Sequence, residues 1–294
     1  MNFPLQIVVN ILYSLLLYQL IATSFTLIYQ TTRFFNLAQA AIISLAAYFT
    51  YIFFIRLGLP FFIAIFISII CSLLISLFSE AIIFRYMREK NLPSLNLLIA
   101  SIGIYTILQN LISLFFGDDT KSIRTDQVNV GYQLLTAYVT GVQIITMIIS
   151  AVLVAAVLLV IYKTLLGRQI RAVGDNPELC NIYGIDSNRT ILWATSMSAV
   201  LAAVAGILIS LETDMKPAFG FDYLLYGVVA MIIGGVGSYR GLFFGSLLLA
   251  TAQHLSAYYL DTRWMDAVAY IILILFLIWK PLGFSGQRLK KIEI

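Results

Sequence analysis

Long runs of uncharged residues alternate with short polar clusters along the whole chain. Asp, Glu, Lys and Arg are absent from residues 1–32, 34–55, 57–79, 91–116, 127–162, 190–211, 223–239 and 241–260. About 20 apolar residues in a helix cross the roughly 30 Å hydrocarbon core of a bilayer, and most of these runs reach that length. The pattern therefore predicts an all-α, polytopic transmembrane helical bundle, with residues 1–294 forming a single membrane domain.

Nine hydrophobic segments are candidates for these helices, which corresponds to eight or nine spans. They cover residues 5–29, 36–56, 60–84, 93–116, 141–163, 190–211, 223–238, 241–259 and 266–280. The segment 223–238 contains four glycines. We expect it to be broken or re-entrant, which a membrane tolerates only where protein or water covers the backbone. The first segment lacks a basic leading region, so we interpret it as a retained span.

Composition excludes a soluble globular domain. The chain is 61% hydrophobic and 11% charged, with a mean hydropathy of +0.95, whereas soluble domains are about half apolar and about a quarter charged. The net charge of +4 arises from cations at the ends of apolar runs, which membrane orientation explains better than nucleic-acid binding. Cys71 lies in an apolar run and Cys180 in a polar loop, so we expect neither a disulfide nor a metal site.

Basic residues gather in the loop 85–90, the loop 163–189 and the C-terminal tail, and the loops between them are net acidic. Lys and Arg collect on the cytoplasmic side of membrane proteins. This rule places Arg88, Arg171 and Lys290 inside, and Asp119 and Asp214 outside. Counting back through three spans then places the N-terminus outside.

No catalytic set is recognisable, and we expect the chain not to be an enzyme. The single histidine, His254, either marks a polar pathway in the membrane or is a hydrogen-bonded packing residue. The glycines of 234–237 lack the Lys-Ser/Thr of a phosphate-binding loop and instead favour close helix packing. Glu80 is expected to form an ion pair with Arg85 near the inner interface, with a coupling role as the alternative.

The loop of about 164–189 carries start and stop signals for a short helix at about 177–183. Asp175 or Asn176 would cap it, Pro177 would open it, and Gly184 would end it. The apolar face would be exposed to water and needs a partner, which is either a protein or the bilayer surface. The predicted contact set is Asp175, Asn176, Glu178, Leu179, Ile182, Tyr183 and Gly184.

Several motifs carry a resemblance to a known family. Residues 178–184 have the spacing of the Glu-Ala-Ala-x-x-x-Gly motif of bacterial ABC importer permeases. Similar matches to the branched-chain amino acid permeases of the LivH type occur at 35–40, 98–117, 167–177, 234–245 and 281–286. Gln39 and Ala40 replace the family's His and Gly, and Leu179 and Cys180 replace two alanines.

The resemblance implies a multi-pass permease subunit of an ABC importer in the bacterial inner membrane. The implied cargo is a small polar solute, such as a branched-chain or related amino acid. The implied partners are cytoplasmic ATPase subunits, an identical or homologous second permease and an extracytoplasmic binding protein. The partner ATPases would bind ATP, and this chain would hold no cofactor. In such permeases the 164–189 loop is the coupling helix that docks on the ATPase.

Four amides are candidates for the substrate pathway: Asn36, Gln39, Gln109 and Asn110. Unpaired amides are costly in hydrocarbon, so Asn36 and Gln39 should face either a wet cavity or a polar contact between packed helices. The rival function is an ATP-independent secondary transporter or channel. That function would need an ion-coupling site, for which Glu80 and His254 are the candidates.

Overall fold

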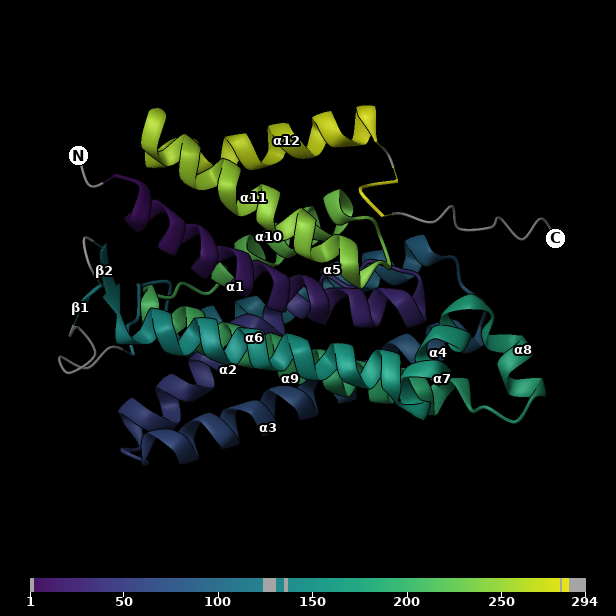
Figure 1. Cartoon of the computed structure of the whole chain (residues 1–294). Helices are drawn as coiled ribbons and strands as arrows, with labels where there is room; N and C mark the ends of the chain where they lie inside the picture. The colour runs from purple at the N-terminus through teal and green to yellow at the C-terminus, as the bar shows by residue number, and fades with distance from the viewer. Residues whose placement is uncertain (1–2, 124–130, 135–136, 281, 286–294) are drawn as a thin grey trace.

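The computed structural model describes residues 3–123, 131–134, 137–280 and 282–285, and Figure 1 shows long helices running side by side along one direction. The sequence predictions for Lys290 and Pro281 lie outside the described residues. Among the described residues, seven helices are long and apolar enough to cross a membrane, or eight if one bent pair counts as a single span. The chain is therefore a multi-pass, all-α membrane protein.

The first half of the chain forms long helices with few breaks. Its elements are α1 (Phe3–Thr32), α2 (Gln39–Tyr51), the π-turn η1 (Ile52–Arg56), α3 (Phe61–Ser79), the π-turn η2 (Glu80–Phe84), α4 (Arg85–Glu89) and α5 (Ser94–Phe116). The predicted loop at 85–90 is wrong, because α3 continues through η2 into α4. No glycine or proline interrupts this stretch before Pro93. The helix ends at Glu89, and Asn91, two residues further on, has a positive φ of 53°.

The second half begins with a small hairpin of β1 (Gly131–Leu134) and β2 (Ala137–Thr140). The helices that follow are α6 (Gly141–Lys163), α7 (Leu165–Asp175), α8 (Pro177–Ile182), α9 (Ser187–Glu212), α10 (Phe219–Gly234), α11 (Tyr239–Tyr259), the 3-10 turn η4 (Thr262–Trp264) and α12 (Met265–Trp279). The sequence analysis missed α7, an amphipathic helix that buries Ile170 and Val173.

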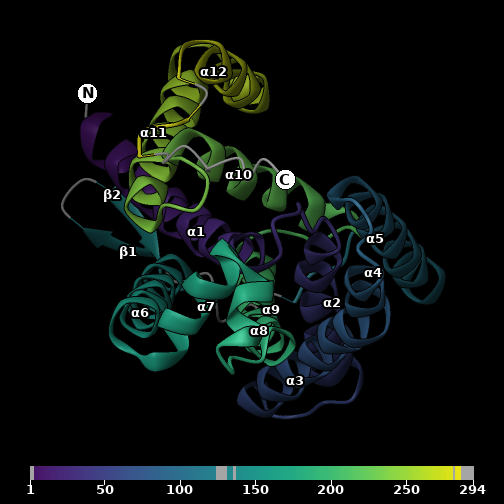
Figure 2. The same cartoon turned by 90° about the vertical axis from the view of Figure 1, so that its right-hand side faces the viewer.

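Helix α1 lies at the centre and packs against α6, α9, α10 and α11. Figure 2 shows α3, α5, α6 and α12 at the periphery around it. Small residues let the central helices approach closely. A Cβ placed on Gly206 of α9 would lie 2.0 Å from the Ile43 carbonyl oxygen of α2. Helix α9 is accordingly mostly buried, whereas α12 exposes most of its surface.

The predicted segments 223–238 and 241–259 correspond to α10 and α11, which together form the bent pair with an angle of 117°. This confirms the expected break in the glycine-rich region. The glycines also permit close packing, since a Cβ on Gly241 would lie 1.9 Å from the Gly234 carbonyl oxygen. After α12, the Phe284 N–H donates to the Ile233 carbonyl at 2.9 Å, and the Ser285 N–H donates to Gly234 at 3.1 Å. These bonds fasten the segment after α12 to the end of α10.

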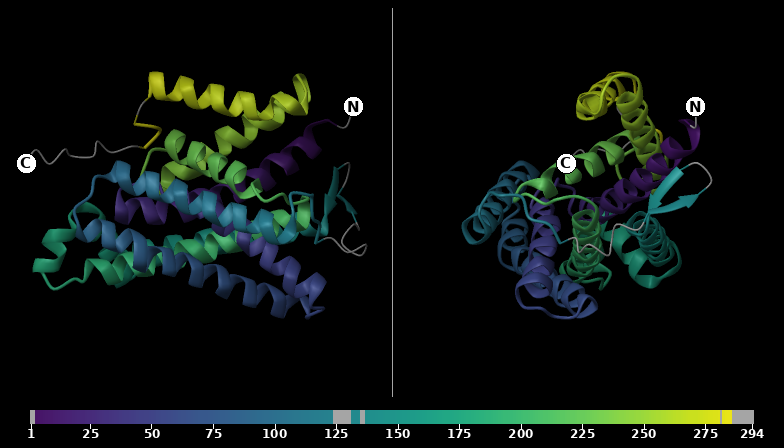
Figure 3. Two further views of the ribbon diagram at one scale, coloured as in Figure 1. Left: turned by 180° about the vertical axis from the view of Figure 1, so that it is seen from behind. Right: turned by 90° about the vertical axis from the view of Figure 1, so that its left-hand side faces the viewer.

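The two ends of the bundle differ in structure (Figure 3). Helices α4, α7 and α8 lie at one end, and the hairpin and the start of α1 lie at the other (Figure 1). Gln6 of α1 bonds to Tyr138 of β2, accepting from its N–H at 2.8 Å. The loops after α5 and α9 are joined by Lys121 and Met215. The basic loops predicted from the charge pattern are thus separated from the hairpin end.

Candidate coupling surface and buried polar pocket

Helix α8 has the start and stop signals that its sequence predicts. The Asn176 side chain accepts a hydrogen bond from the Leu179 N–H at 2.9 Å, so Asn176 is the cap and Asp175 is not. Pro177 occupies the first turn. Gly184 has a φ of +82°, a left-handed conformation that glycine adopts at little cost. The sequence alone therefore fixes this helix to within one residue.

The outer face of α8 is apolar and uncovered. Leu179 is 48% exposed, Ile182 is 80% exposed and Tyr183 is 77% exposed. Cys180 faces the other way and packs with Val173 and Ile191. The helix is thus held on one side and presents its large apolar side chains on the other.

Polar contacts fix α8 to its neighbours. The Ser187 hydroxyl donates to the Pro177 carbonyl at 2.8 Å, and the Ser187 N–H donates to the Asn181 side chain at 3.0 Å. Arg33 donates to the Gly174 carbonyl at 2.7 Å, just before the α8 cap. The Ser187 bonds join α8 to the first turn of α9, and the Arg33 bond joins the end of α7 to the residue that follows α1. A force applied to α8 would therefore act directly on α9.

A small polar cavity of about 10 Å³ lies between α2, α3, α5 and α9. Its lining is formed by Asn36, Ala38, Gln39, Ile42, Ser76, Ser79, Glu80, Phe84, Leu108 and Thr195. Its volume suits about one water molecule. Asn36 and Gln39, predicted as pathway residues, thus meet at the same buried site. Both are almost completely buried, at 6% and 2% exposure.

The Gln39 amide is held by two other helices. It donates to the Ser24 hydroxyl of α1 at 2.5 Å and to the Ser198 hydroxyl of α9 at 2.6 Å. The Asn36 side chain accepts from the Ala38 N–H at 3.2 Å. The contacts of Gln39 are polar contacts between packed helices, the second of the two environments that the sequence predicts for these amides. The sequence analysis missed Ser24 and Ser198, because serine in an apolar helix gives no signal of its partner.

The structure does not bring Gln109 and Asn110 into this cavity. Asn110 is exposed on α5, and its amide donates to the Thr106 carbonyl of the same helix at 2.7 Å. It lies on the outer surface of α5 together with Ile107, Leu111, Ser113 and Leu114. Gln109 is half-buried. The four predicted pathway residues therefore occupy two separate places.

Glu80 forms a buried ion pair, but its partner is Arg88 and not Arg85. The prediction that Arg85 is the partner of Glu80 was wrong, because it assumed the spacing of a regular α-helix between the two residues. Glu80 begins the wide π-turn η2, and Arg88 lies about two turns further along the helix. Arg85 instead pairs with Glu89 at 2.8 Å.

His254 has a partner that the sequence could not identify. Its Nε2 atom and the Ser14 hydroxyl of α1 share a hydrogen bond of 2.8 Å, which supports the packing alternative. Cys71 and Cys180 are both free thiols. Within the described residues, no cluster of three or more His, Cys, Asp or Glu side chains could hold a metal ion.

Comparison with known proteins identifies a transport family for this chain. The family described as the branched-chain amino acid transport system permease component matches residues 7–277. The chain belongs to this family. Permease subunits of this kind are not enzymes, which agrees with the lack of a catalytic set in the sequence.

Two relatives illustrate the family. The chain is 31% identical over 207 residues to the high-affinity branched-chain amino acid transport permease LivH of Escherichia coli, covering 69% of this chain and 67% of LivH. It is 29% identical over 283 residues to BraD of Pseudomonas aeruginosa, covering 92% of both chains. The resemblance drawn from the sequence motifs is therefore confirmed.

A solved structure shares the fold of this permease. PsaBC from Streptococcus pneumoniae in complex with Fab superposes with a TM-score of 0.51 and 16% identity, covering 93% of this chain and 92% of the other. At this identity the similarity concerns the helical arrangement alone.

Proposed function

We propose that this chain is the channel-forming subunit of an ABC importer in the bacterial inner membrane, and that separate cytoplasmic ATPase subunits drive it. A second permease, identical or homologous, and an extracytoplasmic binding protein complete the assembly. The ATPases bind the ATP, and the chain itself holds no cofactor. The cargo is a branched-chain or related amino acid, as the names of the relatives LivH and BraD support.

The observation that carries this proposal is the uncovered apolar face of α8. Leu179, Ile182 and Tyr183 are exposed on a helix that is fixed from behind. Full burial of such a side chain is worth about 1.5–3 kcal/mol, so a groove on an ATPase would bind this face favourably. The ATP-bound ATPase would then have a different affinity for each of two states of the permease, and this difference would shift the equilibrium between those states.

Replacing Ile182 and Tyr183 with Asp tests this docking. We expect the double variant to insert normally but to lose the ATPase subunits on co-purification, or to retain them with hydrolysis uncoupled from transport. The matched control is Leu165→Asp, which changes a side chain of similar exposure, 69%, on the neighbouring helix α7. A fully coupled ATPase in the double variant, as expected if α8 rests on the bilayer surface, would refute the proposal.

The pathway residues need their own test. Replacing Asn36 and Gln39 with Leu should reduce uptake of labelled leucine while the assembly with the ATPases remains intact. Normal uptake by this variant would remove both residues from the pathway. The rival function, ATP-independent transport, predicts that uptake persists when the ATPase subunits are deleted.

A further inference from the structure

A buried ion pair marks the junction between the membrane helix α3 and the peripheral helix α4. The Glu80 side chain is 1% exposed and that of Arg88 is 17% exposed. One oxygen of Glu80, Oε2, has no hydrogen-bond partner among the described residues, and Glu80 also lines the cavity that contains Asn36 and Thr195. The Thr195 hydroxyl likewise has no partner there. Because buried charges are costly unless paired, Arg88 must follow Glu80 in any movement of η2.

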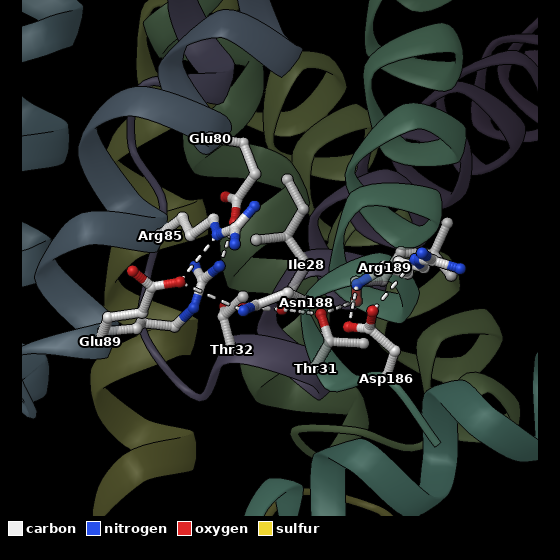
Figure 4. Close-up of polar contacts among 11 residues, drawn as sticks. Ile28, Thr31, Thr32, Glu80, Arg85, Glu89, Asp186, Asn188 and Arg189 are labelled. Carbon is white, nitrogen blue, oxygen red and sulfur yellow. Dashed lines mark hydrogen bonds and ion pairs between the residues drawn. The ribbon is translucent and has the colours of Figure 1, made fainter. Parts of the chain in front are cut away.

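A second contact joins the same helix α4 to α9. Glu89 Oε1 accepts from Arg85 Nε at 2.8 Å and from the Asn188 side chain at 3.4 Å. Figure 4 shows the Glu89 carboxylate directed toward Asn188. Asn188 follows Ser187, the residue whose hydroxyl and N–H are bonded to α8. Polar contacts therefore link α8 to Ser187, Asn188 to Glu89, and Arg88 to Glu80, and the backbone joins each contact to the next at Ser187–Asn188 and at Arg88–Glu89.

We propose that Asn188, Glu89, Arg88 and Glu80 are positioning residues that carry a displacement of α8 to the π-turn η2 and its buried polar cavity. This inference rests on the proposed docking of an ATPase on α8. Helix α4 is the moving part, since it is bound to α9 on one side and to the membrane-buried Glu80 on the other. Its π-turn offers a place where the helix can adjust, as π-turns in functional regions often do.

Distances between spin labels test this transmission in the complex with the ATPase subunits. One label pair is placed at Ile82 of η2 and Ile278 of α12, and a second at Trp193 of α9 and Ile278. All three positions are exposed, and Cys71 and Cys180 are replaced with Ala. ATP with vanadate should shift both distances on the order of 2 Å or more.

In the Asn188→Ala variant we expect the distance between Trp193 and Ile278 still to shift. The shift in the distance between Ile82 and Ile278 should be lost. Glu89→Ala should behave in the same way, and Glu89→Gln, which keeps the acceptor oxygen, should restore the shift. The matched control is Arg189→Ala in the same turn of α9, because Arg189 pairs with Asp186 at 3.1 Å and lies outside this set of contacts. Thermal unfolding of all four variants should match that of the parent.

Glu80→Gln provides a second variant at the buried end. It keeps the shape of the side chain and removes the charge that holds Arg88, so the shift at Ile82 should again be lost. A normal shift at Ile82 in Asn188→Ala overturns the inference and leaves the proposed function intact. Absence of any ATPase bound to the parent chain overturns the proposed function and the inference with it.

Discussion

Single polar residues inside this bundle are held by partners on distant helices. Gln39 is bonded to Ser24 and Ser198, and His254 is bonded to Ser14. Buried polar groups cost free energy unless they are paired, so these contacts determine which helix faces can meet. The residues that the sequence marks as unusual are thus first of all contacts between helices, and any role in transport is built on that packing.

Gln39→Leu should lower the free energy of unfolding by about 1–3 kcal/mol, because it removes hydrogen bonds to Ser24 and Ser198 in a buried site. Thermal unfolding in detergent would measure the change. Asn110→Leu is the control, since its amide is exposed and bonds only to the backbone of its own helix. Equal stability of Gln39→Leu and the parent would show that this amide does not hold the three helices together.

At the scale of elements, the bent pair α10–α11 depends on the segment after α12. The N–H groups of Phe284 and Ser285 bond to carbonyls at the end of α10, where a helix otherwise leaves such groups unpaired. Gly283 makes this approach possible. It has a φ of +68°, and a Cβ added there would lie 2.4 Å from the Gly235 nitrogen.

A left-handed backbone conformation costs a non-glycine residue about 1–2 kcal/mol. Gly283→Ala should lower the free energy of unfolding by more than this amount, because the added Cβ also meets Gly235. The matched control is Gly58→Ala. Gly58 has a φ of +66°, but an added Cβ would have no neighbour within 4 Å, so its cost should come from the backbone alone. Thermal unfolding in detergent would compare the two. Identical losses would mean that the contact with Gly235 is unimportant.

At the scale of the whole molecule, the two ends carry different elements. Helices α4, α7 and α8 gather at one end, and the hairpin lies at the other. The basic residues Arg88 and Arg171 belong to the first group, and the positive-inside rule assigns that end to the cytoplasm. The proposed ATPase and the binding protein would then meet the chain at opposite ends.

Thiol labelling of intact cells tests this orientation. In a background without Cys71 and Cys180, cysteines at Asp119 and Asp214 should react with an impermeant reagent, and a cysteine at Tyr183 should react only after the membrane is permeabilised. All three positions are exposed in the structure. Strong labelling of the Tyr183 position in intact cells would reverse the proposed topology and move α8 out of reach of any cytoplasmic ATPase.

The sequence by itself determined the local features of this protein. Apolar runs of membrane length give the spans, and Asn176, Pro177 and Gly184 give the short helix α8, because capping and backbone preferences act within a few residues. The glycines of 234–237 correctly indicated a break. The sequence motifs also identified the family, since their order is preserved along nearly the whole chain.

Only the tertiary structure decided which polar residues meet. Glu80 could be assigned to Arg88 only once the π-turn was known, and the partners of Gln39 and His254 lie on helices distant in sequence. Uniformly apolar helices carry no strong periodicity to indicate which face is buried, so Gln109 and Asn110 could not be separated in advance from Asn36 and Gln39. The hydrophobicity of the helices places them in the membrane, whereas close packing and polar pairing determine how the helices are arranged within it.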